Sequence, residues 1–223
     1  MAPTLLLDLD GTLTDPAPGI LAGVRVALTA MGREIPPDGD LLSMIGPPIR
    51  VSFRRLLGDD GDIEEGVRLY RAYVAERGLK EAAVYPGILE ALAELREAYA
   101  GRVFICTAKS QPFAQAVADH FGFSPHLAGV YGAHPDGQFE DKADLIAHMI
   151  DTLGIDPATA IMVGDRSYDI AAARKNGMAA LGVLWGYGSQ AELVQAGAHA
   201  LCATPDELAD GCRALAATSW SVP

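Results

Sequence analysis

Short runs of apolar residues alternate along the chain with segments whose apolar positions repeat at three- or four-residue spacing. The short runs carry few polar interruptions, and they read TLLLDL, RVFICTA, GVYGA, AIMVGD, AALGVLW and AHALCA. Near-continuous apolar strands of this kind are typical of a parallel sheet that helices cover on both faces. The pattern therefore predicts an α/β fold with a parallel sheet at its centre.

The segments between these runs carry the periodicity of amphipathic helices. It is clearest at Ile88, Leu92, Leu95 and Tyr99, and again at Leu145, Ile146, Met149, Ile150 and Leu153. Two further helices are expected to begin at capping boxes, one formed by Ser189 with Glu192 and one by Thr204 with Glu207. Strands and helices thus alternate over most of the chain.

One region departs from this alternation. Between Asp15 and Ala82 no run reads as a strand, and the apolar residues follow helical spacing, notably at Ile20, Val24, Leu28 and Met31 and at Ile63, Val67, Tyr70 and Val74. We therefore predict a Rossmann-like core made of residues 1–14 and 83–223, with an all-helical cap inserted at residues 15–82. Such an insertion would lie above the carboxyl edge of the sheet, where open α/β folds bind ligands.

Composition narrows the class of protein. The formal charge of −12 argues against nucleic-acid binding, which normally needs a basic surface. No segment approaches the roughly 20 apolar residues of a membrane span, and no basic residues precede the first apolar run as they would in a signal peptide. The three cysteines, Cys106, Cys202 and Cys212, suggest neither a disulfide framework nor a zinc site. These features predict a soluble cytoplasmic protein.

Carboxylates follow two of the predicted strands. Asp8 and Asp10 come at the end of the first strand, and Asp165 ends another strand, with Asp169 at the start of the next helix. Because parallel strands end at one edge of the sheet, we expect all four carboxylates to converge there. Unpaired, they would repel one another and raise one another's pKa values, so a bound cation is expected. An all-oxygen ligand set suits Mg²⁺.

Two other positions supply complementary groups at this edge. Thr107, in FICTAKS, would present a hydroxyl and the following backbone N–H groups to a phosphate. Lys142 lies in the first turn of a predicted helix, where the helix dipole does not favour a cation. A positive charge at that end of a helix indicates an anion nearby.

These residues resemble the motifs of the haloacid dehalogenase superfamily of phosphotransferases. The D-x-D-G-T motif matches residues 8–12, the Ser/Thr at a strand end matches Thr107, the lysine matches Lys142, and G-D-x-x-x-D matches residues 164–169. Within the insertion, MIGPPIRVSFRRLLG and the closing VYPG are similar to the phosphoglycolate phosphatase group and its 5′-nucleotidase relatives. The resemblance covers nearly the whole chain and implies a helical cap over a catalytic core.

The resemblance also implies a mechanism. Asp8 would attack phosphorus and form an aspartyl-phosphate, while Asp10 would protonate the leaving oxygen and later activate water. Mg²⁺ would be held by Asp8, the backbone carbonyl of Asp10, and Asp165, with Asp169 acting directly or through water. Thr107 and Lys142 would bind the transferring phosphoryl group. The predicted function is a Mg²⁺-dependent phosphatase acting on a small phosphorylated metabolite.

Two basic positions have less certain roles. Lys109 is either a second phosphate or substrate contact or a solvated lysine. Arg50 belongs to a basic cluster with Arg54 and Arg55, and it is either a contact between cap and substrate or part of an exposed helix face. We take Lys109 and Arg50 as candidate substrate ligands.

Other functions remain open at this stage. Asp10 disfavours a dehalogenase, and a phosphonate hydrolase would need a cap lysine, for which the insertion offers only Lys80. A sugar phosphomutase shares the core motifs, and a phospho-acceptor signalling domain combines a similar Asp, Thr and Lys on a shorter chain without a cap. The motifs leave the substrate open between phosphoglycolate and a nucleoside 5′-monophosphate, and the oligomeric state open between monomer and homodimer.

Overall fold

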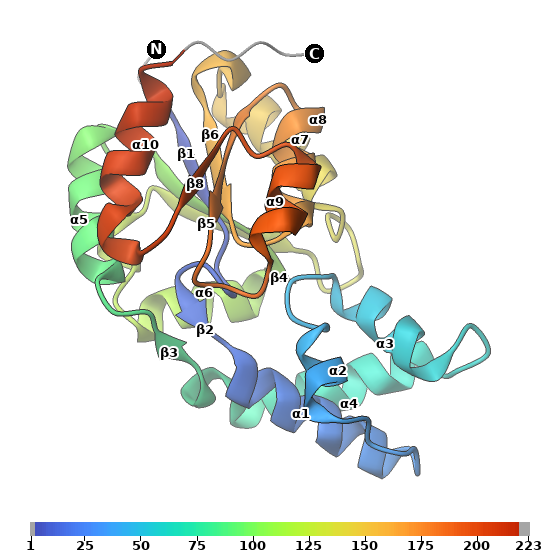
Figure 1. The fold of residues 1–223 in the computed structure, drawn as a ribbon. Helices are drawn as coiled ribbons and strands as arrows, with labels where there is room; N and C mark the ends of the chain where they lie inside the picture. Colours follow the sequence, from blue (N-terminus) through green and yellow to red (C-terminus); the bar gives the residue numbers. More distant parts are fainter. Residues whose placement is uncertain (1–2, 219–223) are drawn as a thin grey trace.

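A computed structural model describes residues 3–218, and its largest feature is a six-stranded sheet flanked by helices (Figure 1). All neighbouring strands of this sheet pair in parallel, in the order β5-β4-β1-β6-β7-β8. The strands are β1 (Leu5–Leu7), β4 (Val103–Ser110), β5 (Gly129–Ala133), β6 (Ile161–Gly164), β7 (Ala179–Val183) and β8 (Ala200–Cys202). Each apolar run of the sequence contributes one of them, with β4 extending two residues beyond its run, so the predicted α/β fold is confirmed.

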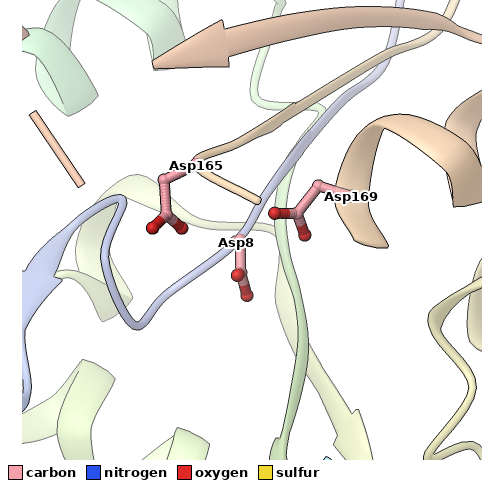
Figure 2. Close-up of side chains that lie close together, drawn as sticks. All are labelled: Asp8, Asp165 and Asp169. Atoms are coloured by element: carbon pink, nitrogen blue, oxygen red, sulfur yellow. The ribbon is translucent and has the colours of Figure 1, made fainter. Parts of the chain in front are cut away.

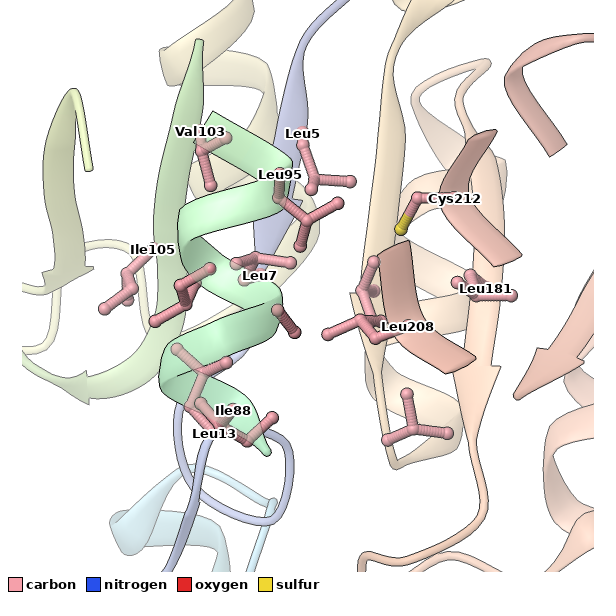
Figure 3. Packing of buried hydrophobic residues seen from close by; sticks show 14 of the residues in the cluster. Leu5, Leu7, Leu13, Ile88, Leu95, Val103, Ile105, Leu181, Leu208 and Cys212 are labelled. Atoms are coloured by element: carbon pink, nitrogen blue, oxygen red, sulfur yellow. The ribbon is translucent and has the colours of Figure 1, made fainter. Parts of the chain in front are cut away.

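Alternating side chains divide the core between the two faces of the sheet. Leu5 and Leu7 pack on one face and Leu6 on the other, all three fully buried. The first face is covered by α5 (Ile88–Ala98), α6 (Gln111–His120) and α10 (Leu208–Ala216). Figure 3 shows part of this packing, with Ile88, Leu95 and Leu208 against the strands. The second face is covered by α7 (Lys142–Leu153), α8 (Ser167–Lys175) and α9 (Gln190–Ala196).

The inserted segment forms a separate group of helices beyond one end of the sheet (Figure 1). These helices are α1 (Ala17–Ala30), α2 (Asp38–Leu42), α3 (Ile49–Leu57) and α4 (Ile63–Glu76). They share a hydrophobic cluster of their own, which includes Val24, Leu28, Phe53 and Val67. The two helices expected from periodicity are therefore present as α1 and α4. The division into a core and a cap domain stays our proposal, which this separate cluster supports.

A two-stranded antiparallel sheet joins the insertion to the core, and sequence analysis missed it. β2 (Thr14–Asp15) pairs with β3 (Ala83–Val84), so the chain enters and leaves the insertion side by side. Each strand has only two residues, which is too short to show alternation in a sequence pattern.

Short 3₁₀ turns complete the connections, at Gly78–Glu81, Ser124–His126, Pro157–Thr159 and Pro205–Glu207. The expected cap at Ser189 is present, because its hydroxyl accepts a hydrogen bond from Glu192 N at 3.1 Å. The expected cap at Thr204 is wrong: its side chain caps nothing, and a 3₁₀ turn occupies the segment before α10 begins. Within residues 3–218, no helix is both long and apolar enough to cross a membrane.

Candidate active site

The register of the central strands places three of the predicted site residues at one edge of the sheet. Leu7 pairs with Ile105 of β4 and with Val163 of β6. Asp8 follows directly, and its N–H donates a hydrogen bond to the Val163 carbonyl oxygen at 2.9 Å. Thr107 and Asp165 each lie two residues beyond these partners. The carboxyl ends of β1, β4 and β6 thus bring Asp8, Thr107 and Asp165 together.

Three carboxylates meet at this edge, from Asp8, Asp165 and Asp169 (Figure 2). Asp169 comes from the first turn of α8, and one oxygen from each of the three residues lies within 4.8 Å of the others. All three side chains are buried. Among residues 3–218, this is the one group of metal-ligating side chains found with such spacing.

Hydrogen bonds fix the orientation of Asp165. Its Oδ2 accepts from Tyr187 N at 2.8 Å, and its Oδ1 accepts from the Thr12 hydroxyl at 3.4 Å. Gly11 passes beside the same carboxylate with φ of +89°, and a Cβ at that position would lie 2.3 Å from Asp165 Oδ2. The Gly-Thr pair of the first motif is therefore needed for close packing and for a hydrogen bond to a carboxylate of another strand.

Asp169 serves two purposes. Its Oδ2 accepts from Arg166 N at 3.0 Å, which satisfies a free N–H at the start of α8. Its Oδ1 forms an ion pair and hydrogen bond with Lys142 Nζ. Gly164 allows this approach, because a Cβ there would lie 2.2 Å from Asp169 Cγ. Asp169 therefore caps the start of α8 and belongs to the carboxylate cluster at the same time.

Lys142 reaches the cluster from the first turn of α7. Its Nζ lies 2.9 Å from Asp8 Oδ1 and also contacts Asp169. The anions that its position indicated are thus these two carboxylates. Burial disfavours the charged amine, but the charges of Asp169 and Asp8 outweigh burial and raise the pKa of Lys142. Lys142 therefore stays protonated.

The cluster still carries excess negative charge. Burial, together with the charges of Asp169 and Asp8, raises the pKa of Asp165 to about 8. Burial also raises the pKa of Asp169 to about 6, although Lys142 opposes the shift. Asp8 Oδ1 is buried and accepts no hydrogen bond from the described residues, despite its proximity to Lys142. Three carboxylates against one ammonium, with an unsatisfied oxygen among them, fit a divalent cation.

Asp10 lies apart from the three carboxylates, which differs from the expected convergence of four. Its side chain forms an ion pair with Lys109, and Lys109 N donates to the Thr107 hydroxyl at 3.3 Å. The chain turns at Gly11 directly after Asp10, so the strand geometry that places Asp8 does not extend to it. Lys109 is therefore a partner of Asp10 and is only partly exposed.

A cavity of about 70 Å³ lies between this edge of the sheet and the inserted helices. The sheet side contributes Asp8, Asp10, Thr107 and Lys109, and the helical side contributes residues of α1 and α4, among them Ile20, Tyr70 and Arg71. The cavity thus brings together side chains that lie far apart in the sequence.

The candidate cap ligand Arg50 does not line this cavity. Its guanidinium binds Glu64 through Nε at 2.7 Å and Nη2 at 3.1 Å, and it also pairs with Glu140. Glu140 and Arg71 do line the cavity, and sequence analysis missed both. For Arg71 a signal existed, since it adjoins the buried positions Tyr70 and Val74 of α4.

Several known proteins resemble this chain in sequence and in structure. The chain is 40% identical over 195 residues to a 5′-nucleotidase from Pseudomonas aeruginosa, with 86% of each protein covered. It is 39% identical to the tyrosine-protein kinase PtkA of Mycobacterium tuberculosis, over 82% of this chain and 62% of that protein. It is 32% identical to a phosphoglycolate phosphatase of Chromobacterium violaceum, over 83% of this chain and 86% of the relative.

Among solved structures, a predicted phosphatase from Clostridium acetobutylicum superposes with a TM-score of 0.89 at 33% identity, covering 94% of this chain and 97% of the other. The family model for haloacid dehalogenase-like hydrolases matches residues 2–177. The expected family and the expected enzyme class, a phosphatase, are confirmed by these matches. The chain belongs to the haloacid dehalogenase-like hydrolases.

Proposed function

We propose that this protein is a Mg²⁺-dependent phosphomonoesterase that acts on a small phosphorylated metabolite through an aspartyl-phosphate on Asp8. The observation that carries the proposal is the position of Asp8: its buried Oδ1 lacks a hydrogen bond and lies 2.9 Å from Lys142 Nζ, at the wall of the cavity. A carboxylate oxygen held in this way is oriented for attack on an incoming phosphate.

In the first step, a carboxylate oxygen of Asp8 attacks phosphorus and the bond from phosphorus to the ester oxygen breaks. The departing oxygen takes a proton from Asp10, whose side chain also faces the cavity. Lys109 Nζ contacts Asp10 and can donate a hydrogen bond to its carboxyl group in either protonation state, so it holds that group at the cavity wall in both steps. In this step the substrate loses its phosphoryl group to Asp8 and leaves as an alcohol.

In the second step, Asp10 removes a proton from water as the water oxygen attacks the phosphorus bound to Asp8. The bond between phosphorus and the Asp8 oxygen breaks, so inorganic phosphate is released and the Asp8 carboxylate returns. One aspartate thus acts first as acid and then as base, because each step leaves it in the protonation state that the next step needs.

Charge on the phosphoryl group has to be neutralised in both steps. The Thr107 hydroxyl and the Lys142 ammonium are positioned for this, since both are buried beside Asp8 at the same edge. Asp8, Asp165, Asp169 and the backbone carbonyl of Asp10 would hold Mg²⁺. When bound there, the ion supplies the charge compensation that lets the anionic substrate approach Asp8.

The size of the cavity favours a small substrate. At about 70 Å³ the cavity is much smaller than the neighbouring hollow of about 400 Å³, which favours a phosphate group with a short organic part, such as phosphoglycolate. A second hollow of about 400 Å³, lined partly by Val51, Lys142 and Tyr168, borders the site, and a nucleoside would have to extend into it. Filling that hollow with Val51→Trp should therefore impair nucleotide hydrolysis and spare phosphoglycolate.

The relative named as a tyrosine kinase raises an alternative acceptor. A phosphoryl group on Asp8 can pass to water or to a hydroxyl of another molecule, and the same choice separates a phosphatase from a phosphomutase. A phospho-acceptor domain would instead keep the group. We retain the phosphatase because similar proteins are named 5′-nucleotidase and phosphoglycolate phosphatase, and because Asp10 lies at the cavity wall, where it can activate water. A cytoplasmic location and a monomeric or homodimeric state stay predictions.

The test is phosphate release from a panel of phosphomonoesters, with Mg²⁺ and with excess EDTA. We expect many turnovers with Mg²⁺ and none with EDTA, with kcat/KM highest for phosphoglycolate or a nucleotide. Full activity in EDTA would refute the metal requirement. Phosphorylated protein without turnover would support an acceptor domain, and phosphate transfer to an added sugar phosphate would support a mutase.

A further inference from the structure

Two positively charged side chains line the cavity, and their surroundings differ. Lys109 is neutralised by Asp10 through a direct ion pair. Arg71, on α4 of the inserted helices, donates one hydrogen bond, from Nη1 to the Pro135 carbonyl oxygen at 2.8 Å. No carboxylate within the described residues comes close enough to Arg71 to form an ion pair. Most of its N–H donors are therefore available to a ligand.

The neighbouring guanidinium of Arg50 is fully engaged by contrast. It binds Glu64 and Glu140, and Glu140 is the acidic residue that the cavity shares with this network. Because Arg50 neutralises Glu140, that carboxylate does not bind Arg71. The two arginines thus have separate partners: Arg50 holds acidic side chains of the protein, and Arg71 faces the cavity.

The surroundings of Arg71 favour an additional anion. Burial lowers the pKa of Arg71, and the positive charge of Arg50 lowers it further, while Glu140 and Glu64 oppose this. An anionic group on the substrate would offset both unfavourable effects. A guanidinium is suited to a carboxylate in particular, because its parallel N–H groups match the two carboxylate oxygens.

We propose that Arg71 is a specificity-determining residue that binds a carboxylate on the substrate, in the same cavity that Asp8 lines. The substrate class is then a small phosphomonoester of a hydroxy acid, with the phosphate held by the sheet side and the carboxylate held by α4. This rests on the proposed phosphatase function and refines it. The hydrogen bond from Arg71 to the Pro135 carbonyl oxygen could instead give Arg71 a purely structural role. The experiment therefore has to separate that role from binding of the substrate carboxylate.

The experiment uses a matched pair of substrates, 2-phosphoglycolate and its neutral carboxamide, which differ in one charge. We expect Arg71→Gln to lower the ratio of kcat/KM for the acid to kcat/KM for the amide by about 10- to 100-fold, the effect of losing a hydrogen-bonded charge. Most of the change should be in KM for the acid. Arg71→Lys, which keeps the charge, should recover part of the ratio.

Arg68→Gln is the matched control, because Arg68 lies one turn earlier on α4, pairs with Glu65 and is exposed to solvent. For Arg68→Gln, the ratio of kcat/KM for the acid to kcat/KM for the amide should stay within about twofold of the wild-type ratio. The proposal would be overturned if Arg71→Gln left the ratio of kcat/KM for the acid to kcat/KM for the amide unchanged. This would be so whether hydrolysis of both substrates slowed equally or neither slowed. Equal slowing would show that Arg71 only supports the loop at Pro135.

Binding to the Asp8→Asn protein separates this inference from the proposed function, because binding does not need turnover. In that background, 2-phosphoglycolate should bind about tenfold or more tightly than the amide, and Arg71→Gln should abolish the difference. Equal affinities before the Arg71 change would refute the inference. Absence of phosphate release by the wild type would refute the proposed function alone.

Discussion

The two walls of the cavity are built in different ways. The sheet wall takes Asp8 and Thr107 from the ends of parallel strands, where pairing along the strands fixes each position to one residue. The helical wall takes Tyr70 and Arg71 from α4, which packs into a separate hydrophobic cluster. We therefore expect the sheet wall to set the chemistry, and the helical wall to be able to change its contacts without disturbing that chemistry.

The two walls also differ in how deeply their charged groups are buried and in how these groups are paired. Charged groups at the sheet are buried and crowded, so the pKa of Asp165 rises to about 8. Charged groups on the helical side are partly exposed and mostly paired with one another, as Arg50 is with Glu64. Substitutions at the sheet should thus cost far more activity than substitutions in the helices.

The largest expected effect among charge changes is at Lys142. Lys142→Ala removes the ammonium beside Asp8 and should lower kcat by about 10²-fold or more, because it removes a charge directed at the phosphoryl group. Steady-state kinetics at saturating Mg²⁺ measures this. Lys175→Ala is the control, since Lys175 is exposed and forms only a long ion pair, 3.7 Å from Asp144. If Lys142→Ala lowered kcat by less than about threefold, Lys142 would not take part in phosphoryl transfer.

A second expected effect concerns stability and pH. Without metal, folded Asp165 keeps a proton up to about pH 8, whereas in the unfolded chain it loses the proton near its ordinary pKa of 3.8. The folded state therefore binds more protons between these values, and the stability of the metal-free protein falls as pH rises through that window. Mg²⁺ binds the ionised form, so its stabilising effect should grow with pH.

Thermal unfolding with Mg²⁺ and with EDTA tests this. The gain in Tm from Mg²⁺ should be larger at about pH 8 than at about pH 5.5, by about 3 °C or more. Asp165→Asn should remove most of this difference and raise the Tm of the metal-free protein at the higher pH. A gain independent of pH in the wild type would contradict the assignment of the carboxylate cluster to the metal.

The smallest expected effect is at Arg50. Arg50→Gln frees Glu140, which can then pair with Arg71, so kcat/KM for phosphoglycolate should fall by about fivefold. The double variant Arg50→Gln with Glu140→Gln should recover activity to within about twofold of the wild type. If both variants lose the same activity, Arg50 contacts the substrate itself, as the sequence first suggested.

The sheet wall could be predicted from the sequence because its pattern is local. An apolar strand followed by an acid places that acid at the carboxyl edge, and this holds for Asp8 and Asp165 alike. Lys142 was recognisable from its unusual position at a helix start, and the structure shows the carboxylates that it contacts. Parallel pairing then brings these residues together without further information.

The remaining contacts depend on packing between distant segments. Asp10 leaves the strand at a glycine turn, so its pairing with Lys109 follows from the loop and not from the register. Arg71 adjoins buried positions of α4, but the sequence does not show that this part of α4 lines the cavity, because that depends on how the inserted helices pack against the core. The same holds for Tyr187, whose N–H orients Asp165 from 22 residues away.

The central claim is that Asp8 is the nucleophile and Asp10 the acid and base, and the leaving group separates the two roles. An alkoxide needs the proton from Asp10, whereas p-nitrophenolate leaves readily as an anion. Asp10→Asn should therefore hydrolyse an alkyl phosphate about 10²-fold or more slowly, the usual cost of losing general acid–base catalysis.

The most direct measurement is rapid mixing of Asp10→Asn with p-nitrophenyl phosphate and Mg²⁺, followed by nitrophenol absorbance and intact-protein mass. We expect a burst of about one equivalent of nitrophenol, a phosphoryl group on Asp8, and then slow turnover, because water is no longer activated. Asp8→Asn should give no burst. Turnover of both substrates by the Asp10 variant at the wild-type rate, without a burst, would contradict the mechanism.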